Sequence, residues 1–216
     1  MADKPKQLPD GAVKRSFGIA DMRAVDDGTY IEGHAAVYNQ KTAIGDWFYE
    51  VIERGAFDSC NFDDVLFCVN HDLQKIPLAR SRRNNANSTM QLRMDEAGLY
   101  IRANLDIENN SESKSLYSAV TRQDIDGMSF IFFIGEEKWE DLDSKMPTRR
   151  ILKINRVIEV SAVNFPAYSG TDINARDQGA LDNAQSALEN ARSQLDNSAD
   201  ELEMERLRTL ILIKGV

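Results

Sequence analysis

Short runs of β-branched and aromatic residues recur between about residue 16 and residue 171, and they constrain the fold more than any other feature of the chain. Gly, Asn and Asp turns separate the runs, as is typical of strands. The runs are Tyr30–Tyr38, Trp47–Ile52, Val65–Val69, Met90–Met94, Leu99–Ala103, Met128–Ile134 and Ile151–Val163. The chain lacks alternating strand and helix units and a Gly-rich phosphate loop, which disfavours a doubly wound fold. The pattern predicts a mixed β/α fold, a small closed or curled β-barrel of about seven strands with a few helices.

Two segments depart from this pattern and predict helices. Asn109–Glu112 resembles a capping segment, and three apolar residues that follow share one helical face. Near the end of the chain, leucines recur every seven residues, which predicts a helical tail. They are Leu181, Leu188, Leu195 and Leu202. The chain therefore divides into a disordered lead-in (1–15), a strand-rich domain (16–175) and an acidic helical tail (176–216) that is able to self-associate or bind a partner.

Composition excludes several classes of function. The chain has 216 residues and a net charge of −9, whereas sequence-independent binding to DNA or RNA requires a basic patch. The longest apolar runs are too short to cross a bilayer and no signal peptide is recognisable, so we expect no membrane association. Cys60 and Cys68 stand alone, without the spacing of a disulfide framework or a zinc site.

Three short segments each place one reactive side chain among strand-forming residues. They are Val69–Asp72, Asp126–Phe130 and Ile158–Ser161, which contain His71, Ser129 and Glu159. A serine hydroxyl is inert near neutral pH without an adjacent base, and a carboxylate commonly orients that base. The three segments therefore favour a serine protease.

Each of these residues also has a structural interpretation. Ser129 lies in an apolar run and is compatible with a hydrogen-bonded core serine. Glu159 could pair with Arg156 or Arg102 instead of orienting a histidine. Asp126, which lies near Ser129 in the sequence, is the alternative to Glu159 as the carboxylate that orients the base. For His34, which lies in an alternating strand, the structural role is favoured over a catalytic one.

The joint occurrence of five motifs resembles tailed-phage prohead serine proteases, the capsid maturation family. In chain order the motifs are Gly33–Asn39, Glu53–Phe57, Asn70–Asp72, Gly127–Phe130 and Glu159–Tyr168. The resemblance covers roughly residues 16 to 175 and implies a fold related to the herpesvirus assembly proteases. It implies His71 as the base, Ser129 as the nucleophile and Glu159 as the third member, with neither a cofactor nor a metal.

The same resemblance implies a biological role. The substrates would be the major capsid protein and its scaffold segment, cleaved inside the assembling prohead in the host cytoplasm. The junction between domain and tail, Asn164–Arg176, contains proline, glycine and small polar residues, so we expect self-cleavage beyond about Tyr168.

Two alternatives from other classes stay open. The helical tail is compatible with a non-catalytic capsid assembly or scaffolding protein that carries a protease-like domain. His71 and Asp72, with nearby carboxylates, are the only basis for a metal-dependent hydrolase, which two histidines without ligand spacing support poorly.

Overall fold

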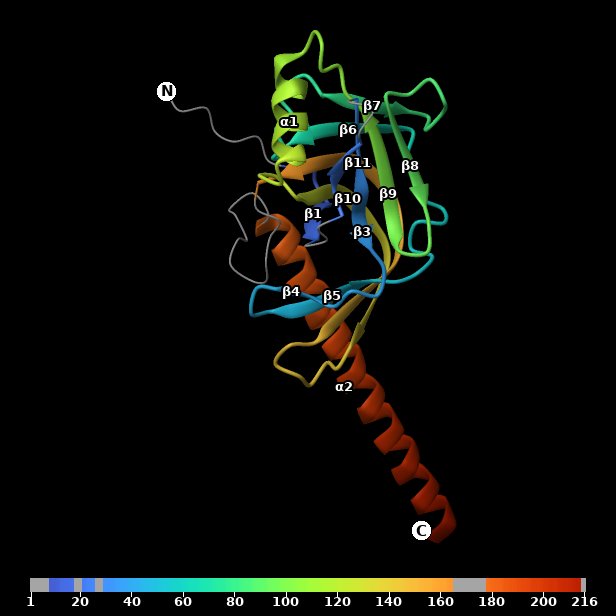
Figure 1. The fold of residues 1–216 in the computed structure, drawn as a ribbon. Helices are drawn as coiled ribbons and strands as arrows, with labels where there is room; N and C mark the ends of the chain where they lie inside the picture. Colours follow the sequence, from blue (N-terminus) through green and yellow to red (C-terminus); the bar gives the residue numbers. More distant parts are fainter. Residues whose placement is uncertain (1–7, 18–20, 26–28, 165–177, 215–216) are drawn as a thin grey trace.

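In a computed structural model, the chain forms eleven strands and two helices within the residues that the structure describes, which are 8–17, 21–25, 29–164 and 178–214. The strands are β1 (Ala12–Phe17), β2 (Arg23–Ala24), β3 (Tyr30–Val37), β4 (Thr42–Ile44), β5 (Phe48–Ile52), β6 (Asp64–Val69), β7 (Ala79–Arg82), β8 (Met90–Met94), β9 (Gly98–Asn104), β10 (Gly127–Glu140) and β11 (Thr148–Val163). The helices are α1 (Ser111–Thr121) and α2 (Gln178–Lys214). Figure 1 shows α1 lying against the strands and α2 running away from them.

The described strands form two sheets. In the larger one, the order is β1-β10-β11-β5-β4, and β6 pairs with β11 while β7 pairs with β6. The smaller sheet has the order β2-β3-β9-β8. The mixed β/α class is confirmed, but the predicted small closed or curled barrel of about seven strands does not form a closed barrel: the described strands lie in two sheets that are not closed. Periodicity identifies which face of a strand is apolar, whereas the partner of each strand depends on contacts distant in the sequence.

The longest strands, β10 and β11, form an antiparallel hairpin that carries the candidate site. The register shifts several times between Ile131 and Glu137, which marks bulges that bend the hairpin. Gly135 lies in this bent part, where a Cβ atom would come within 2.2 Å of Asn155 Oδ1. The inner part of β10, its first six residues, is buried, and the outer part is half-buried or exposed. The hydrophobic pattern therefore predicts only the inner part of this strand, because the outer part is rich in charged residues.

Apolar side chains from both sheets meet in a single core around the inner half of this hairpin. The smaller sheet contributes Ile31, Leu99 and Ile101, and the larger contributes Phe130 and Val160, all with no exposed surface. Burying one such side chain stabilises a fold by about 1.5–3 kcal/mol. The core thus holds the inner strands in a defined register.

The N-terminal strand β1 closes one edge of the larger sheet. Val13 is buried in the core, and Arg15 Nε lies 2.6 Å from Oε1 of the buried Glu50. The prediction that residues 1–15 form a disordered lead-in was therefore wrong for residues 12–15. Backbone pairing with β10, two buried apolar residues and one buried ion pair dock this strand, and none of them produces a periodic pattern in the sequence.

Helix α1 begins with a cap inside the segment that the sequence predicts. Asn110 is the N-cap, and its side chain accepts hydrogen bonds from the backbone N–H groups of Glu112 and Ser113. These bonds satisfy two of the donors that are free at a helix start. Leu116 and Val120 are buried, so the predicted apolar face packs on the strands.

The N-terminal part of the C-terminal helix α2 packs on the domain. Leu181 and Ala184 are buried against Phe48, with Ile44 and Trp139 beside them. Farther along, the large apolar side chains with substantial exposure are Leu195, Leu202, Met204 and Leu207. The expected helical tail is present, whereas the junction at residues 165–177, where self-cleavage was expected, lies outside the described residues. Within the described part of the chain, no helix is both long enough and apolar enough to cross a membrane.

Candidate active site

Strand register brings the three singled-out residues to one face of the larger sheet. In the β10–β11 hairpin, Ser129 lies opposite Ser161, so their side chains share a face. Glu159 lies two residues before Ser161 and therefore also on that face. β6 runs parallel to β11 and ends beside it, so His71, two residues beyond β6, reaches the same place.

His71 lies between the other two residues. Its Nδ1 atom is 2.7 Å from Glu159 Oε2, and its Nε2 atom is 2.6 Å from Ser129 Oγ. Both distances are within hydrogen-bonding range. A carboxylate, an imidazole and a hydroxyl in this order form the arrangement that activates a serine nucleophile.

A tight turn holds the imidazole in position. Asn70 and His71 have φ angles of 52° and 59°, in the left-handed region that is uncommon for residues other than glycine and recurs at functional sites. The Asn70 N–H donates to the carbonyl of Ala162 at 2.9 Å. The Asn164 N–H donates to Asn70 Oδ1 at 3.1 Å. Because both bonds reach the end of β11, the strand that carries the carboxylate also fixes the turn that carries the base.

The carboxylate of Glu159 has no exposed surface. A buried carboxylate is costly unless hydrogen bonds or opposite charges compensate it. Its hydrogen-bond partners among the described residues are the His71 ring and the Ser161 hydroxyl. Arg102, considered above as an alternative partner, lies 3.7 Å from Glu32 instead. The sequence did not single out Ser161, because nothing local distinguishes it from an ordinary hydrogen-bonded core serine in the mostly apolar stretch Val157–Val163.

The hydroxyl of Ser129 has a second contact in addition to His71. Its Oγ atom lies 2.8 Å from the Arg15 carbonyl on β1, and the side chain has no exposed surface. A serine has only one O–H hydrogen, so it donates either to this carbonyl or to the imidazole. Attack on a substrate requires donation to His71 and access to Oγ. Acylation therefore requires a local opening beside this atom.

A thiol also lies near this cluster. Cys68 on β6 stands opposite Ser161 in the parallel register. Burial, with smaller contributions from the charges of Glu159 and Asp72, raises the pKa of Cys68 to about 12. The thiolate is the nucleophilic form of cysteine, so the raised pKa disfavours Cys68 as nucleophile, whereas the hydroxyl of Ser129 has an imidazole within hydrogen-bonding distance.

The geometry does not favour the metal-site interpretation of His71 and Asp72. Both ring nitrogens of His71 already have partners in Ser129 and Glu159. Across the described ranges, His, Cys, Asp and Glu side chains do not form a group of three or more that could hold a metal ion. The cluster matches acyl transfer better than metal coordination.

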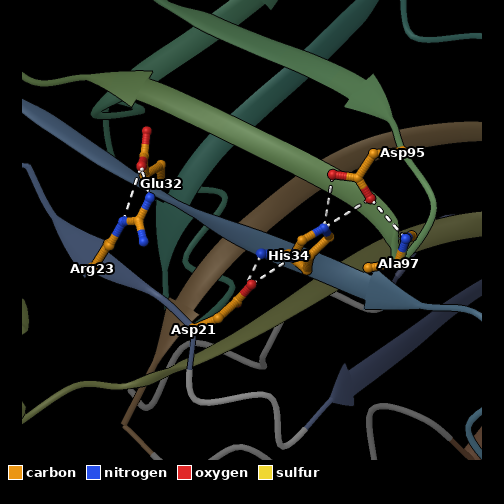
Figure 2. Close-up of polar contacts among 7 residues, drawn as sticks. Asp21, Arg23, Glu32, His34, Asp95 and Ala97 are labelled. Carbon is orange, nitrogen blue, oxygen red and sulfur yellow. Dashed lines mark hydrogen bonds and ion pairs between the residues drawn. The ribbon is translucent and has the colours of Figure 1, made fainter.

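The second histidine, His34, lies in a separate polar cluster (Figure 2). Its Nδ1 atom is 2.5 Å from Asp21 Oδ2, and its Nε2 atom is 3.0 Å from Asp95 Oδ1. Asp95 also accepts the backbone N–H of Ala97 at 2.9 Å. The imidazole thus joins the segment before β2 to the β8–β9 turn, which supports the structural role.

This cluster predicts a pH dependence of stability. Burial alone would lower the pKa of His34, but hydrogen bonds and charges from Asp21 and Asp95 outweigh burial and raise it. A raised folded-state pKa stabilises the fold fully below the unfolded value of about 6.5, and this contribution is lost as the pH rises through the folded-state value. We expect the difference in melting temperature between wild type and His34→Gln to be largest near pH 5 to 6 and to shrink at higher pH.

The matched control is His71→Gln, which alters the other of the two histidines. Thermal unfolding of all three proteins between about pH 5 and 9 should show the decline in wild type and His71→Gln but not in His34→Gln. Identical pH profiles for wild type and His34→Gln would contradict the role given to the two aspartates.

Comparison with known proteins supports the interpretation of this site at the level of a family. The family model of caudovirus prohead serine proteases matches residues 19–185. Comparisons with curated proteins and with solved structures gave no match. The matched range includes His71, Ser129 and Glu159 and extends into the first turns of α2. Since the match covers well over half of the chain, the protein belongs to the caudovirus prohead serine protease family.

Proposed function

We propose that this chain is a serine endopeptidase with Ser129 as nucleophile, His71 as general base and Glu159 as the residue that orients the base. The observation that carries the proposal is the unbroken hydrogen-bonded series from the buried carboxylate through the imidazole to the hydroxyl. Membership of a serine protease family supports the same reaction.

The reaction follows general acyl-transfer chemistry. His71 Nε2 takes the Ser129 proton as Oγ attacks the carbonyl carbon of a peptide bond, and it then returns that proton to the leaving amine. Water hydrolyses the acyl-enzyme with the same base. Glu159 holds Nδ1–H and stabilises the imidazolium that forms. Backbone N–H groups stabilise the oxyanion, and the scheme needs neither a metal nor an organic cofactor.

The substrates in this proposal are the capsid precursor and its scaffold segment, cleaved inside the assembling prohead. The family assignment supports this role. In the same proposal, residues 16–175 form the protease domain and residues 176–216 form a targeting tail. The exposed leucines of α2, Leu195 at 45% and Leu202 at 68%, would contact scaffold or capsid protein during assembly, because an exposed apolar stripe is stabilised by a partner.

The experiment that tests this function follows intact masses after co-expression with the capsid precursor of the same phage. We expect wild type to cleave the precursor and to lose its own C-terminal segment beyond about Tyr168, whereas Ser129→Ala does neither. From the mean residue mass of the 24.3-kDa, 216-residue chain, loss of the residues after Tyr168 corresponds to a fragment of about 5.4 kDa, cut at a junction whose proline, glycine and small polar residues are typical of segments that proteases cut.

The other outcomes separate the alternatives. Intact precursor with both proteins would favour the non-catalytic scaffolding role. Cleavage that EDTA abolishes and a serine-directed phosphonate does not affect would favour a metal-dependent hydrolase. Precursor cleavage by a wild-type chain that stays full length would support the protease function and would indicate that α2 is a permanent docking element. Identical trimming in Ser129→Ala would identify a contaminating protease.

A further inference from the structure

One buried hydroxyl contacts two members of the proposed triad at the same time. Ser161 donates its O–H to Glu159 Oε1 and accepts the backbone N–H of His71, with 2.9 Å between His71 N and Ser161 Oγ. Its side chain has no exposed surface. One donor hydrogen and one lone pair are thus both used, each on a residue that the proposed reaction requires.

Two buried serines outside the proposed site do not have such contacts. The hydroxyls of Ser81 and Ser113 are buried and have no hydrogen-bond partner in the described structure. Serines are therefore tolerated in this core for their size alone. The two contacts of Ser161 do not follow from burial alone, since Ser81 and Ser113 are buried with unpaired hydroxyls.

The contacts restrain the atoms on which proton transfer depends. The bond to Oε1 fixes the rotation of the Glu159 carboxylate, so that Oε2 faces His71 Nδ1 at 2.7 Å. The bond from the His71 N–H anchors a residue whose φ of 59° lies in the left-handed region, where a non-glycine backbone persists only when surrounding contacts hold it. Ser161 thereby sets the distance and angle between the carboxylate and the imidazole.

We propose that Ser161 is a positioning residue for the peptide-bond hydrolysis assigned to Ser129, His71 and Glu159, and this inference rests on that proposed function. Ser161 touches neither the nucleophile's reacting atom nor the substrate in this role. It acts through Glu159 and His71. Its removal should therefore lower the rate of the chemical step and leave the binding of a substrate or inhibitor unchanged.

The test measures how fast a fluorophosphonate labels the full-length protein, as a function of its concentration. This probe reports the nucleophilicity of the serine oxygen through the maximal rate, and binding through the half-saturating concentration. We expect Ser161→Ala to reduce the maximal rate by about 10- to 100-fold, the effect of losing a hydrogen bond to a charged group. The half-saturating concentration should not change. Ser161→Thr keeps a hydroxyl and should restore most of the rate.

Two comparisons separate positioning from a general effect on the core. Ser81→Ala removes a buried, unpaired hydroxyl from β7 and should label at the wild-type rate. Adding Ser161→Ala to Glu159→Gln should cause a smaller loss than Ser161→Ala causes alone, because one of the two contacts of Ser161 is to that carboxylate and coupled residues are not additive. This double-mutant comparison does not depend on whether the extra methyl of threonine fits.

The outcomes distinguish this inference from the proposed function. If Ser129→Ala abolishes labelling and Ser161→Ala labels like wild type, only the positioning role is overturned. A full additional loss on the Glu159→Gln background, or an equal loss in Ser81→Ala, would likewise make Ser161 a structural residue. If Ser129→Ala is labelled as fast as wild type, the proposed function itself fails, whatever Ser161 does.

Discussion

Ser129→Ala and His71→Ala should each reduce cleavage of the capsid precursor by about 10⁴- to 10⁶-fold, the range seen when a nucleophile or its base is removed from a serine protease. Without Ser129 no acyl-enzyme forms. Without His71, no base within 2.6 Å of Ser129 Oγ accepts its proton. The measurement is the cleavage rate of the precursor by purified variants, with thermal unfolding as a check that each variant is folded.

The double variant is the sharper part of this prediction. Because the two residues act as a unit, Ser129→Ala with His71→Ala should be little worse than either single change. Matched controls are Ser81→Ala, another buried serine, and His34→Gln, the other histidine, which should both cleave at rates near wild type. Cleavage by Ser129→Ala at a rate near wild type would contradict the assignment of Ser129 as the nucleophile.

Glu159→Gln should reduce cleavage by about 10²- to 10⁴-fold, a smaller effect than loss of the nucleophile. The substitution keeps the shape of the side chain but removes the charge that stabilises the imidazolium. It also places an amide beside Nδ1, which disturbs the tautomer that His71 needs. The rate should be measured with the same precursor, at a pH where wild type is fully active.

The matched control is Asp126→Asn, which alters the carboxylate that directly precedes β10 and lies three residues before Ser129. The structure places Glu159 Oε2, and not Asp126, at 2.7 Å from His71 Nδ1, so Asp126→Asn should cleave at a rate close to wild type. If Asp126→Asn is the more damaging of the two, Asp126 is the third member and Glu159 is a buried structural carboxylate.

The expectations from sequence held where the signal is local. The strand-rich composition, the capped helix at residues 111–121 and the helical tail all follow from periodicity and from residue types within a few positions. The three residues proposed for catalysis were also recognisable, because each stands as a polar residue in or beside an apolar run and their motifs occur in the order of a known family. That family assignment is confirmed.

Three features had no local signal. β1 is docked by Val13 and by the ion pair of Arg15 with Glu50, which lies 35 residues away. The division into two sheets depends on which strands pair across long separations. The role proposed for Ser161 depends on the position of its hydroxyl between the Glu159 carboxylate and the backbone N–H of His71, 90 positions away in the sequence.

The sequence by itself determined the longer strands, the two helices and which side chains can do chemistry, since hydrophobic periodicity and reactive residue types are properties of short segments. Only the tertiary structure decided that His71, Ser129 and Glu159 meet. Their meeting depends on two registers, antiparallel between β10 and β11 and parallel between β11 and β6. A shift of one residue in either register would move a side chain to the opposite face of the sheet. Packing of the shared core selects the register, and that packing is a property of the whole domain.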